Sequence, residues 1–480
     1  MVFNSPQFLL FLPLVVLAYY LVPRQGRNLF LLYVLASGTP AGPALRHGGG
    51  LFRRSRAGQA APSPAPMAGG RGSAGIFAAY HPQVPDFSGQ FLLGGAGASG
   101  DSDRTAGFQL AAAHGHFFLY AAGSGLSHRC LPRRTRRKSL LQIALFVAFF
   151  PQLASGPISR GKSLLAQFHA PQKLQFDHLR DGVLLMIWGY FLKIVIADRA
   201  AIFVNTVYTL ENGFDGWFLI VATLLFGVQL YCDFSGCTTI AMGAAKLLGI
   251  DLIDNFQAPY LSRSNAEFWR RWHISLSTWF RNYLYIPLGG NRKGKARKYL
   301  NVLITFAVSG LWHGAQWSFV FWGLLNGLYQ VVGDLLRPVR RKLLHLTALD
   351  TDTLGHKVVQ VVCTCLCVNL SWAFFRANRL MDSLTILHSM LTAKNFFILF
   401  DGSLYTCGLD AINFRLLLVY IGILFVVDLC KYKGIVIRRG IARQSWLCQV
   451  LVVTFGVLAI LLLGVYGPGF EAADFIYSQF

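Results

Sequence analysis

The sequence predicts an all-α protein, a polytopic bundle of transmembrane helices with re-entrant or interfacial helices among them. Three observations lead to this fold class. Apolar residues make up 54% of the 480 residues. Several apolar stretches approach the length that a helix needs to cross a bilayer. Finally, one segment rich in aromatic and arginine residues, 265–292, is too polar to span. No internal repeat is visible, which disfavours the duplicated halves common in transporters.

The first element is an apolar run over residues 1–22. It opens like a secretory signal, but no Lys or Arg precedes the run and no small-residue cleavage site follows it. We therefore expect a retained first span. The basic residues come directly afterwards, in PRQGRN, so the positive-inside rule places the N-terminus outside the cytoplasm.

The composition then changes between residues 38 and 138. Nineteen of the 48 glycines lie here, together with twelve Arg or Lys and only three Asp, so the segment carries +9 of the formal charge of +23. Composition alone predicts a disordered linker. The charge therefore says little about an anionic partner of the whole chain, and we expect no nucleic-acid partner.

A frameshift is the alternative interpretation of residues 38–138. Read one base later with permitted codons, the stretch from His114 can give MGISFYTLQALGYLIDVYR, a string typical of a membrane protein. The hypothesis is that the segment replaces two or three lost spans. The nucleotide sequence of the gene tests it, because stop codons throughout the shifted frame would contradict it.

Apolar spans return after residue 139 and continue to the C-terminus. The chain thus divides into residues 1–37 with the first transmembrane segment, the suspect segment 38–138, and a membrane core, 139–480, which holds the candidate functional motifs. The expected spans are 140–155 (short), 182–204, 216–232, 298–312, 317–335, 357–375, 412–430 and 446–466, with weaker apolar stretches near 240–253 and 384–400.

The nine cysteines are scattered, mostly within or beside apolar runs, which disfavours a disulfide framework. Cys363, Cys365 and Cys367 alternate, and positions two apart on a helix point in different directions. We therefore expect small packing residues there and no metal site.

The segment 265–292 reads NAEFWRRWHISLSTWFRNYLYIPLGGNR. A helical phase places Trp269, Trp272, Leu276 and Trp279 roughly on one side. An in-plane or re-entrant segment fits, because irregular backbone at membrane depth is tolerated where protein or a water-filled cavity receives it. The basic run that follows is either a solvated positive-inside loop or a contact for the phosphate of an anionic cofactor.

His313 lies in SGLWHGAQW, near the end of an expected span. A histidine that only packs in the core is the competing interpretation. Ionisable groups inside membrane segments are costly, however, and imidazole can accept a proton from an attacking alcohol near neutral pH. Gly310 and Gly314 could leave room for a ligand to approach the backbone.

Two further stretches break apolar runs with Ser, Gly and Pro. They are PQLASGPISR at residues 151–160 and QLYCDFSGCTTI at 229–240, which contains the carboxylate of Asp233. Either stretch could line a cavity or simply end a helix.

Several ordered motifs resemble the membrane-bound O-acyltransferase (MBOAT) family. They are FFPQLASGPISR, YCDFSG, FWRRWHISLSTWFRNYLYIPLGGNRKG, SGLWHGAQWSFVFWGLLNG, WAFFRA and DFIYSQF. The most similar branch is the bacterial alginate O-acetyltransferase type, which is related to the protein that D-alanylates teichoic acids. The resemblance covers residues 1–37 and 139–480.

This resemblance implies a bundle around a central tunnel, with an acyl donor entering from the cytoplasm and an acceptor hydroxyl from outside. It implies catalytic roles for His313 and His273. Thr239 and Asn282 stand where the branch usually has Asp, which puts a carboxylate role there in doubt. The candidates for substrate contact or tunnel lining are Trp312, Gly314, Trp317, Asp233, Ser235, Arg281, Asn282 and Tyr283.

The implied function is O-acetylation of an exported, alginate-like polysaccharide. The donor is expected to be acetyl-CoA or another acyl thioester, with no tightly bound cofactor. The expected partners are membrane lipids, the polysaccharide and a periplasmic SGNH-hydrolase-like acetyltransferase, and the expected location is a bacterial inner membrane. The alternatives are a polysaccharide export or transporter subunit, and D-alanyl transfer to a cell-wall polymer.

Overall fold

A computed structural model describes residues 3, 5–38, 140–170, 172–346, 350, 352–377 and 379–466. Within these ranges every regular element is a helix, as the sequence predicts. The chain divides into two compact units, one comprising Met1–Leu35 and Gly107–Phe480, the other Ala36–Ala106. Of the second unit, only the end of one helix is among the described residues. The suspect segment therefore lies outside the described residues, apart from Gly38.

The expected N-terminal span is a helix in the structure, α1 (Pro6–Leu21), which is apolar but shorter than the helices long enough to cross a membrane, and it is followed by α2 (Arg27–Gly38). The Ser5 hydroxyl caps α1 by accepting a hydrogen bond from the backbone N–H of Phe8 at 3.2 Å. Phe8 and Leu12 are buried among apolar side chains of α8 and α10, which ties this span to the bundle.

The expected short span 140–155 is instead two helices, α5 (Leu140–Ala148) and α6 (Phe150–Ser155). The PQLASGPISR stretch ends α6 and continues as extended chain to α7 (Gly161–His169). Of the two readings of that stretch, the end of a helix is the one observed.

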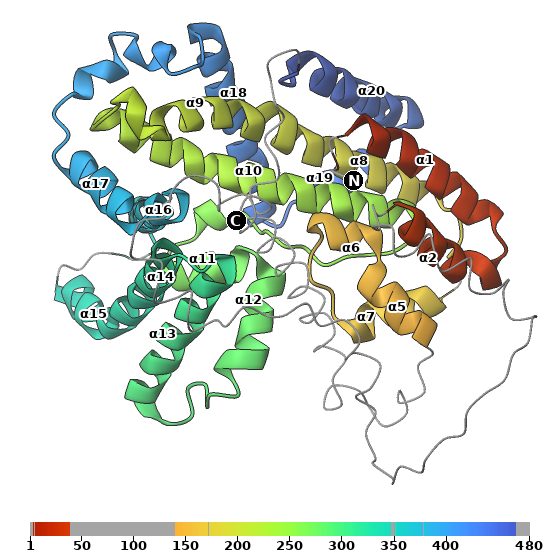
Figure 1. Ribbon diagram of the computed structural model, residues 1–480, viewed down its shortest axis with the longest axis horizontal. Helices are drawn as coiled ribbons and strands as arrows, with labels where there is room; N and C mark the ends of the chain where they lie inside the picture. The colour runs from red at the N-terminus through yellow and green to blue at the C-terminus, as the bar shows by residue number, and fades with distance from the viewer. Residues whose placement is uncertain are drawn as a thin grey trace, which may run out of the picture. The chain divides into compact units, whose positions relative to one another are not determined.

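The centre of the bundle is α10 (Trp217–Leu247), a helix of 31 residues. It packs along a continuous helical stretch made of α8 (Phe176–Tyr190), a π-helical turn η4 (Phe191–Ala197) and α9 (Asp198–Tyr208) (Figure 1). The FSG motif does not break α10. Gly236 instead permits close packing, since a Cβ there would lie 2.8 Å from the carbonyl oxygen of Gly189.

Segment 265–292 folds into two short helices, α11 (Asn265–Arg271) and α12 (Ile274–Phe280), followed by a π-helical turn η7 (Arg281–Tyr285). The expected single helical phase is wrong, because His273 has a φ of +43° and separates the two helices. Next comes a hairpin of α13 (Gly294–His313) and α14 (Trp317–Leu335), and then α15 (Arg337–Leu346).

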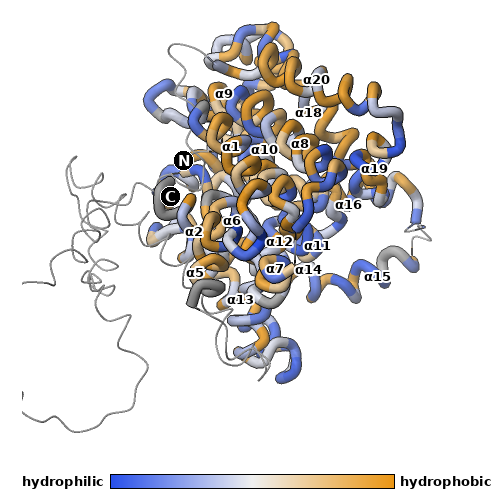
Figure 2. The backbone as a smooth tube through the Cα atoms, turned by 90° about the vertical axis from the view of Figure 1, so that its right-hand side faces the viewer, coloured by the Kyte–Doolittle hydropathy of each residue, from blue (hydrophilic) through white to orange (hydrophobic). Residues whose placement is uncertain are grey.

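The remaining helices run to the end of the described chain. They are α16 (Leu354–Arg376), α17 (Leu380–Leu391), α18 (Ala411–Tyr432), α19 (Ile437–Ala442) and α20 (Trp446–Leu463), with 3-10 turns at Leu210–Asn212, Phe396–Leu399 and Ser403–Thr406. Among the described residues, α10, α16, α18 and α20 are long and apolar enough to cross a membrane. Figure 2 shows that most residues of α10, α18 and α20 are hydrophobic, whereas α15 carries many hydrophilic residues. The eight described cysteines are free, which agrees with the expected lack of a disulfide framework.

Candidate active site

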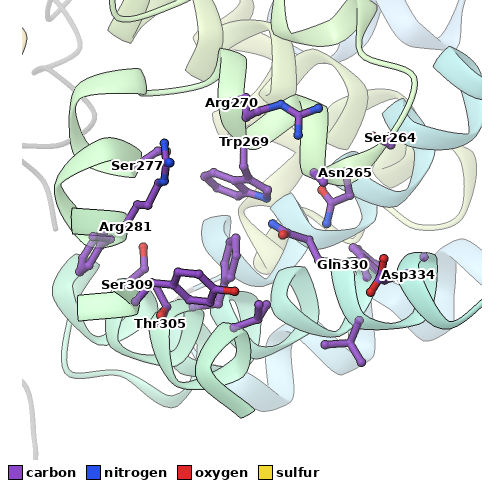
Figure 3. Close-up of a pocket in the computed structure, with 18 of the residues that line it drawn as sticks. Ser264, Asn265, Trp269, Arg270, Ser277, Arg281, Thr305, Ser309, Gln330 and Asp334 are labelled. Carbon is purple, nitrogen blue, oxygen red and sulfur yellow. The ribbon is translucent and has the colours of Figure 1, made fainter. Parts of the chain in front are cut away.

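The hairpin α13–α14, the two short helices α11 and α12 and the start of α15 enclose a cavity of about 600 Å³. Figure 3 shows its polar side chains: Arg270 and Ser277 from α11 and α12, Thr305 and Ser309 from α13, and Gln330 from α14. Both candidate catalytic histidines, His273 and His313, also line it. Two segments that are separate in sequence thus contribute imidazoles to one space.

His313 is the last residue of α13 and is only 4% exposed. Aromatic rings surround its imidazole: the centroid of the Trp312 ring lies 4.7 Å away, that of Trp322 5.1 Å and that of Phe375 5.2 Å. The Trp322 and Phe375 rings meet the imidazole edge to face. This packing restricts water around the imidazole and fixes the plane of its ring.

The two glycines beside His313 have a different role from the one expected. Gly310 packs against α14, where an added Cβ would overlap the carbonyl oxygen of Phe319. A Cβ on Gly314 would lie 2.7 Å from the Phe319 ring. The expectation that these glycines admit a ligand to the backbone is therefore wrong, because helix packing already fills the space beside them.

His273 lies at the bend between α11 and α12 and is also 4% exposed. Its ring meets Phe234 of α10 edge to face at 4.6 Å, and the Trp312 ring is 6.5 Å away. Trp312 therefore lies against both histidines. Burial lowers the pKa of His273 to about 3, so its imidazole is neutral at physiological pH.

The outer part of the cavity is strongly basic. Arg270, Arg281, Lys298, Arg337 and Arg340 line it, against a single carboxylate, Asp334, among the described lining residues. Asp334 is already engaged: its Oδ2 lies 2.7 Å from Lys298 Nζ and accepts a hydrogen bond from the Tyr299 hydroxyl at 3.1 Å. The excess of positive charge favours an anionic ligand.

The cavity does not bring all the sequence candidates together. Besides the two histidines, only Arg281 of the candidate set is among its lining residues. Trp312 packs with Ile158, Leu276 and Phe280. The remaining candidates, Gly314, Trp317, Asp233, Ser235, Asn282 and Tyr283, lie outside the lining set.

Those remaining candidates have other surroundings. Asp233 is buried in α10 and forms an ion pair of 2.7 Å with Lys193, which also pairs with Asp198 at 2.9 Å. The carbonyl oxygen of Ser235 accepts a hydrogen bond from the Thr239 hydroxyl at 2.6 Å. Exposed candidates include Trp317, at the start of α14, and Asn282 and Tyr283, on η7.

Several residues that line the cavity were not among the candidates predicted from the sequence. Thr305 and Ser309 precede His313 at four-residue spacing, which places all three on one face of α13, and this spacing was available in the sequence. Gln330 and the α15 arginines had no comparable signal, because only the folded hairpin brings α14 and α15 opposite α11.

Comparisons with known proteins identify the family of the chain. The profile of the membrane-bound O-acyltransferase family matches residues 102–375. The chain is similar to a protein of Pseudomonas putida named probable alginate O-acetylase AlgI, with 38% identity over 51% of this chain and 47% of that protein. It is 38% identical to the peptidoglycan O-acetyltransferase of Helicobacter pylori, over 52% of this chain and 46% of that protein.

A more distant relative is the teichoic acid D-alanyltransferase of Bacillus subtilis, with 28% identity over 42% of this chain and 54% of that protein. The chain spans about half the length of the curated relatives it matches. The matched region of the family profile contains both histidines and the whole described lining of the cavity.

Proposed function

This chain belongs to the membrane-bound O-acyltransferase family, and from that premise we propose that it transfers an acetyl group from a thioester to a hydroxyl of an exported polysaccharide. Family membership and the four long apolar helices make it a multi-pass membrane protein. The single observation that carries the proposal is the cavity that His273 and His313 both line, and whose basic entrance holds Arg270, Arg281, Lys298, Arg337 and Arg340.

The donor enters at the basic end of the cavity. Lys298 and His313 lie one near each end of α13, roughly 22 Å apart along the helix axis at the usual rise per residue. An elongated donor with phosphate at one end and a thioester at the other suits this arrangement. Acetyl-CoA has that chemistry, and so does an acyl group on a phosphopantetheine arm.

His313 is the proposed general base. Its imidazole accepts the proton of the acceptor hydroxyl as that oxygen forms a bond to the thioester carbonyl carbon. The carbon–sulfur bond then breaks, and the imidazolium returns the proton to the leaving thiolate. The products are an ester and a free thiol, and the surrounding rings of Trp322 and Phe375 limit competing hydrolysis by water.

The relatives guide the choice of acceptor. Two relatives, named a probable alginate O-acetylase and a peptidoglycan O-acetyltransferase, are more similar to this chain than the one named a teichoic acid D-alanyltransferase. We place the protein in a bacterial inner membrane with its N-terminus outside the cytoplasm, and we expect a periplasmic acetyltransferase to receive the acyl group or complete the transfer.

Chemical analysis of the exported polysaccharide tests the proposal. Ester-linked acetate should be present in cells with the gene, absent from a deletion strain, and restored by the gene on a plasmid. Unchanged acetate in the deletion strain would contradict acetyl transfer, and loss of ester-linked D-alanine in its place would favour the D-alanyl alternative.

A further inference from the structure

Asn255 is a buried residue on the segment between α10 and α11, with 1% of its surface exposed. Its side-chain Oδ1 accepts hydrogen bonds from the backbone N–H of Ser275 at 3.1 Å and from the Ser275 hydroxyl at 2.9 Å. The same oxygen lies 3.2 Å from Nδ1 of His273. Its backbone oxygen accepts a hydrogen bond from the N–H of Ile274 at 3.0 Å. One residue, through its side chain and its backbone, therefore contacts three successive residues of the bend, His273, Ile274 and Ser275.

The backbone N–H of Ser275 settles which end of the Asn255 amide faces the bend. A backbone N–H can only donate, so the atom facing it is the carbonyl oxygen and not the NH2 group. Nδ1 of His273 faces that same oxygen at 3.2 Å and the Ser275 hydroxyl at 3.5 Å. The single proton of that hydroxyl is already donated to Oδ1 of Asn255, so Nδ1 carries a proton of its own. The lone pair of the neutral imidazole is then on Nε2.

The two possible orientations of the Asn255 amide have different costs. The alternative orientation would place two N–H donors of Asn255 against the N–H of Ser275. The observed orientation leaves Nδ2 of Asn255 buried with no hydrogen-bond partner among the described residues, which costs about 1–3 kcal/mol. The contacts to Ser275 and His273 outweigh that cost in setting the orientation.

We propose that Asn255 is a positioning residue, whose side-chain oxygen holds His273 in the tautomer with a proton on Nδ1, so that Nε2 is the hydrogen-bond acceptor in the cavity. What His273 accepts there, the acceptor hydroxyl, rests on the proposed function. The tautomer itself does not.

An amide and a carboxylate at position 255 have different consequences. Both accept a hydrogen bond from Nδ1, but only a carboxylate adds a negative charge that stabilises the imidazolium. The side chains packed on His273 from other elements are Phe234 and Trp312. The ionisable groups that share its cavity from α11, η7 and α13 include Arg270, Arg281 and His313. Asn255 therefore directs His273 without making it more basic.

Chemical modification of His273 tests the contact between Asn255 and Nδ1 of the imidazole without any acyl transfer. Diethyl pyrocarbonate reacts with the unprotonated imidazole, and peptide mass mapping measures the modification of His273 alone. The quantity measured is the rate of His273 modification in the full-length protein, divided by the rate for N-acetylhistidine in the same tube. This ratio should rise as the pH falls from 8 to 5, because N-acetylhistidine becomes protonated near pH 6.5 and reacts more slowly, whereas His273 stays neutral. In Asn255→Asp the His273 rate should itself fall across that range. An unchanged pH profile in Asn255→Asp would overturn the proposal.

A kinetic cycle gives a second test, which also applies if the buried carboxylate prevents folding. Asn255→Ser should lower the turnover number about tenfold to hundredfold, the range known for hydrogen-bond partners of metal-bound histidines, with little change in KM. In a His273→Ala background it should add nothing. An equal loss in both backgrounds would show a purely structural role and refute the positioning. If the wild-type protein shows no acyl transfer but the modification profile of His273 is as expected, the result counts against the proposed function and leaves the role of Asn255 intact.

Discussion

Two buried histidines face one cavity, and the ring of Trp312 lies against both of them. The residues around them separate two tasks. Aromatic side chains restrict water at His313, whereas hydrogen bonds from the Asn255 segment orient His273. A site of this kind can accept a proton without exposing a reactive ester or thioester to solvent.

The basic entrance gives a prediction about the donor. Replacing Arg270 and Arg340 together with Gln should raise the KM for the acyl thioester about twofold to fivefold per charge, the range of exposed charge pairs, and leave the turnover number nearly unchanged. Both arginines are exposed and line the cavity. Added salt should reduce the difference, because it screens such contacts.

The control for that experiment is Arg443→Gln, an exposed arginine after α19 and outside the cavity lining. Equal KM changes in the control and the double variant would mean that overall charge, and not the entrance, determines donor binding.

Sequence reasoning identified both histidines but misjudged their neighbours. Gly310 is small because α14 packs on it, and the sequence alone does not distinguish a glycine beside a ligand from one beside a helix. Asp233 had the opposite difficulty. A lone carboxylate in an apolar run looks functional, but its partner Lys193, which also pairs with Asp198, comes from another helical stretch.

The α13–α14 hairpin depends on glycine at the crossing. A Cβ on Gly310 would overlap the carbonyl oxygen of Phe319, and one on Gly323 would overlap that of Phe306. Gly310→Leu should therefore separate the two helices, displace His313 and lower folded yield, with a cost of about 1–3 kcal/mol or more. Size-exclusion chromatography in detergent and thermal unfolding measure this.

Gly422 on α18 provides the matched control, since no atom of the described residues lies within 4 Å of the position of its Cβ. Gly422→Leu should leave yield and unfolding temperature nearly unchanged. If Gly310→Leu behaved in the same way, close packing would not be what positions His313.

The buried ion pairs between the α8–α9 stretch and α10 give a prediction about stability. Lys193→Met would leave Asp198 and Asp233 without their cation in a site where both partners are 3% exposed, which costs about 3–5 kcal/mol. Lys246→Met is the control, because its partner Asp251 is 67% exposed and such pairs contribute about 0–1 kcal/mol. Similar unfolding temperatures for the two variants would contradict the structural role.

At this scale the sequence predicted most of the helices and missed where they join. The expected stretches 216–232 and 240–253 belong to one helix, α10, although residues 248–253 of the second stretch lie beyond its end. Gly236 in the FSG motif does not interrupt this helix, because it packs against Gly189. Conversely, the segment 265–292 breaks at His273, since its positive φ is set by contacts with Asn255 that are distant in sequence.

At the level of the whole molecule, the frameshift interpretation of residues 38–138 is a prediction that an expression experiment can test. The family match begins inside this segment, at residue 102. If the segment is out of frame, the chain lacks spans that should complete the bundle, because lipid-facing backbone must satisfy its hydrogen bonds internally. A frame-corrected version should then show higher membrane yield and more ester transfer than the chain as written, when both are expressed in one host. Equal yield and transfer would establish the segment as a genuine insertion.

The central claim is that His313 accepts the proton of the hydroxyl that attacks the thioester. Its most direct test is the initial rate of radiolabelled acetyl transfer from acetyl-CoA to a polysaccharide acceptor, measured for purified wild type, His313→Ala and His388→Ala, an exposed histidine of α17. The account predicts that His313→Ala loses about a hundredfold to ten-thousandfold in rate at unchanged folded yield, while His388→Ala retains the wild-type rate. A wild-type rate in His313→Ala would contradict it.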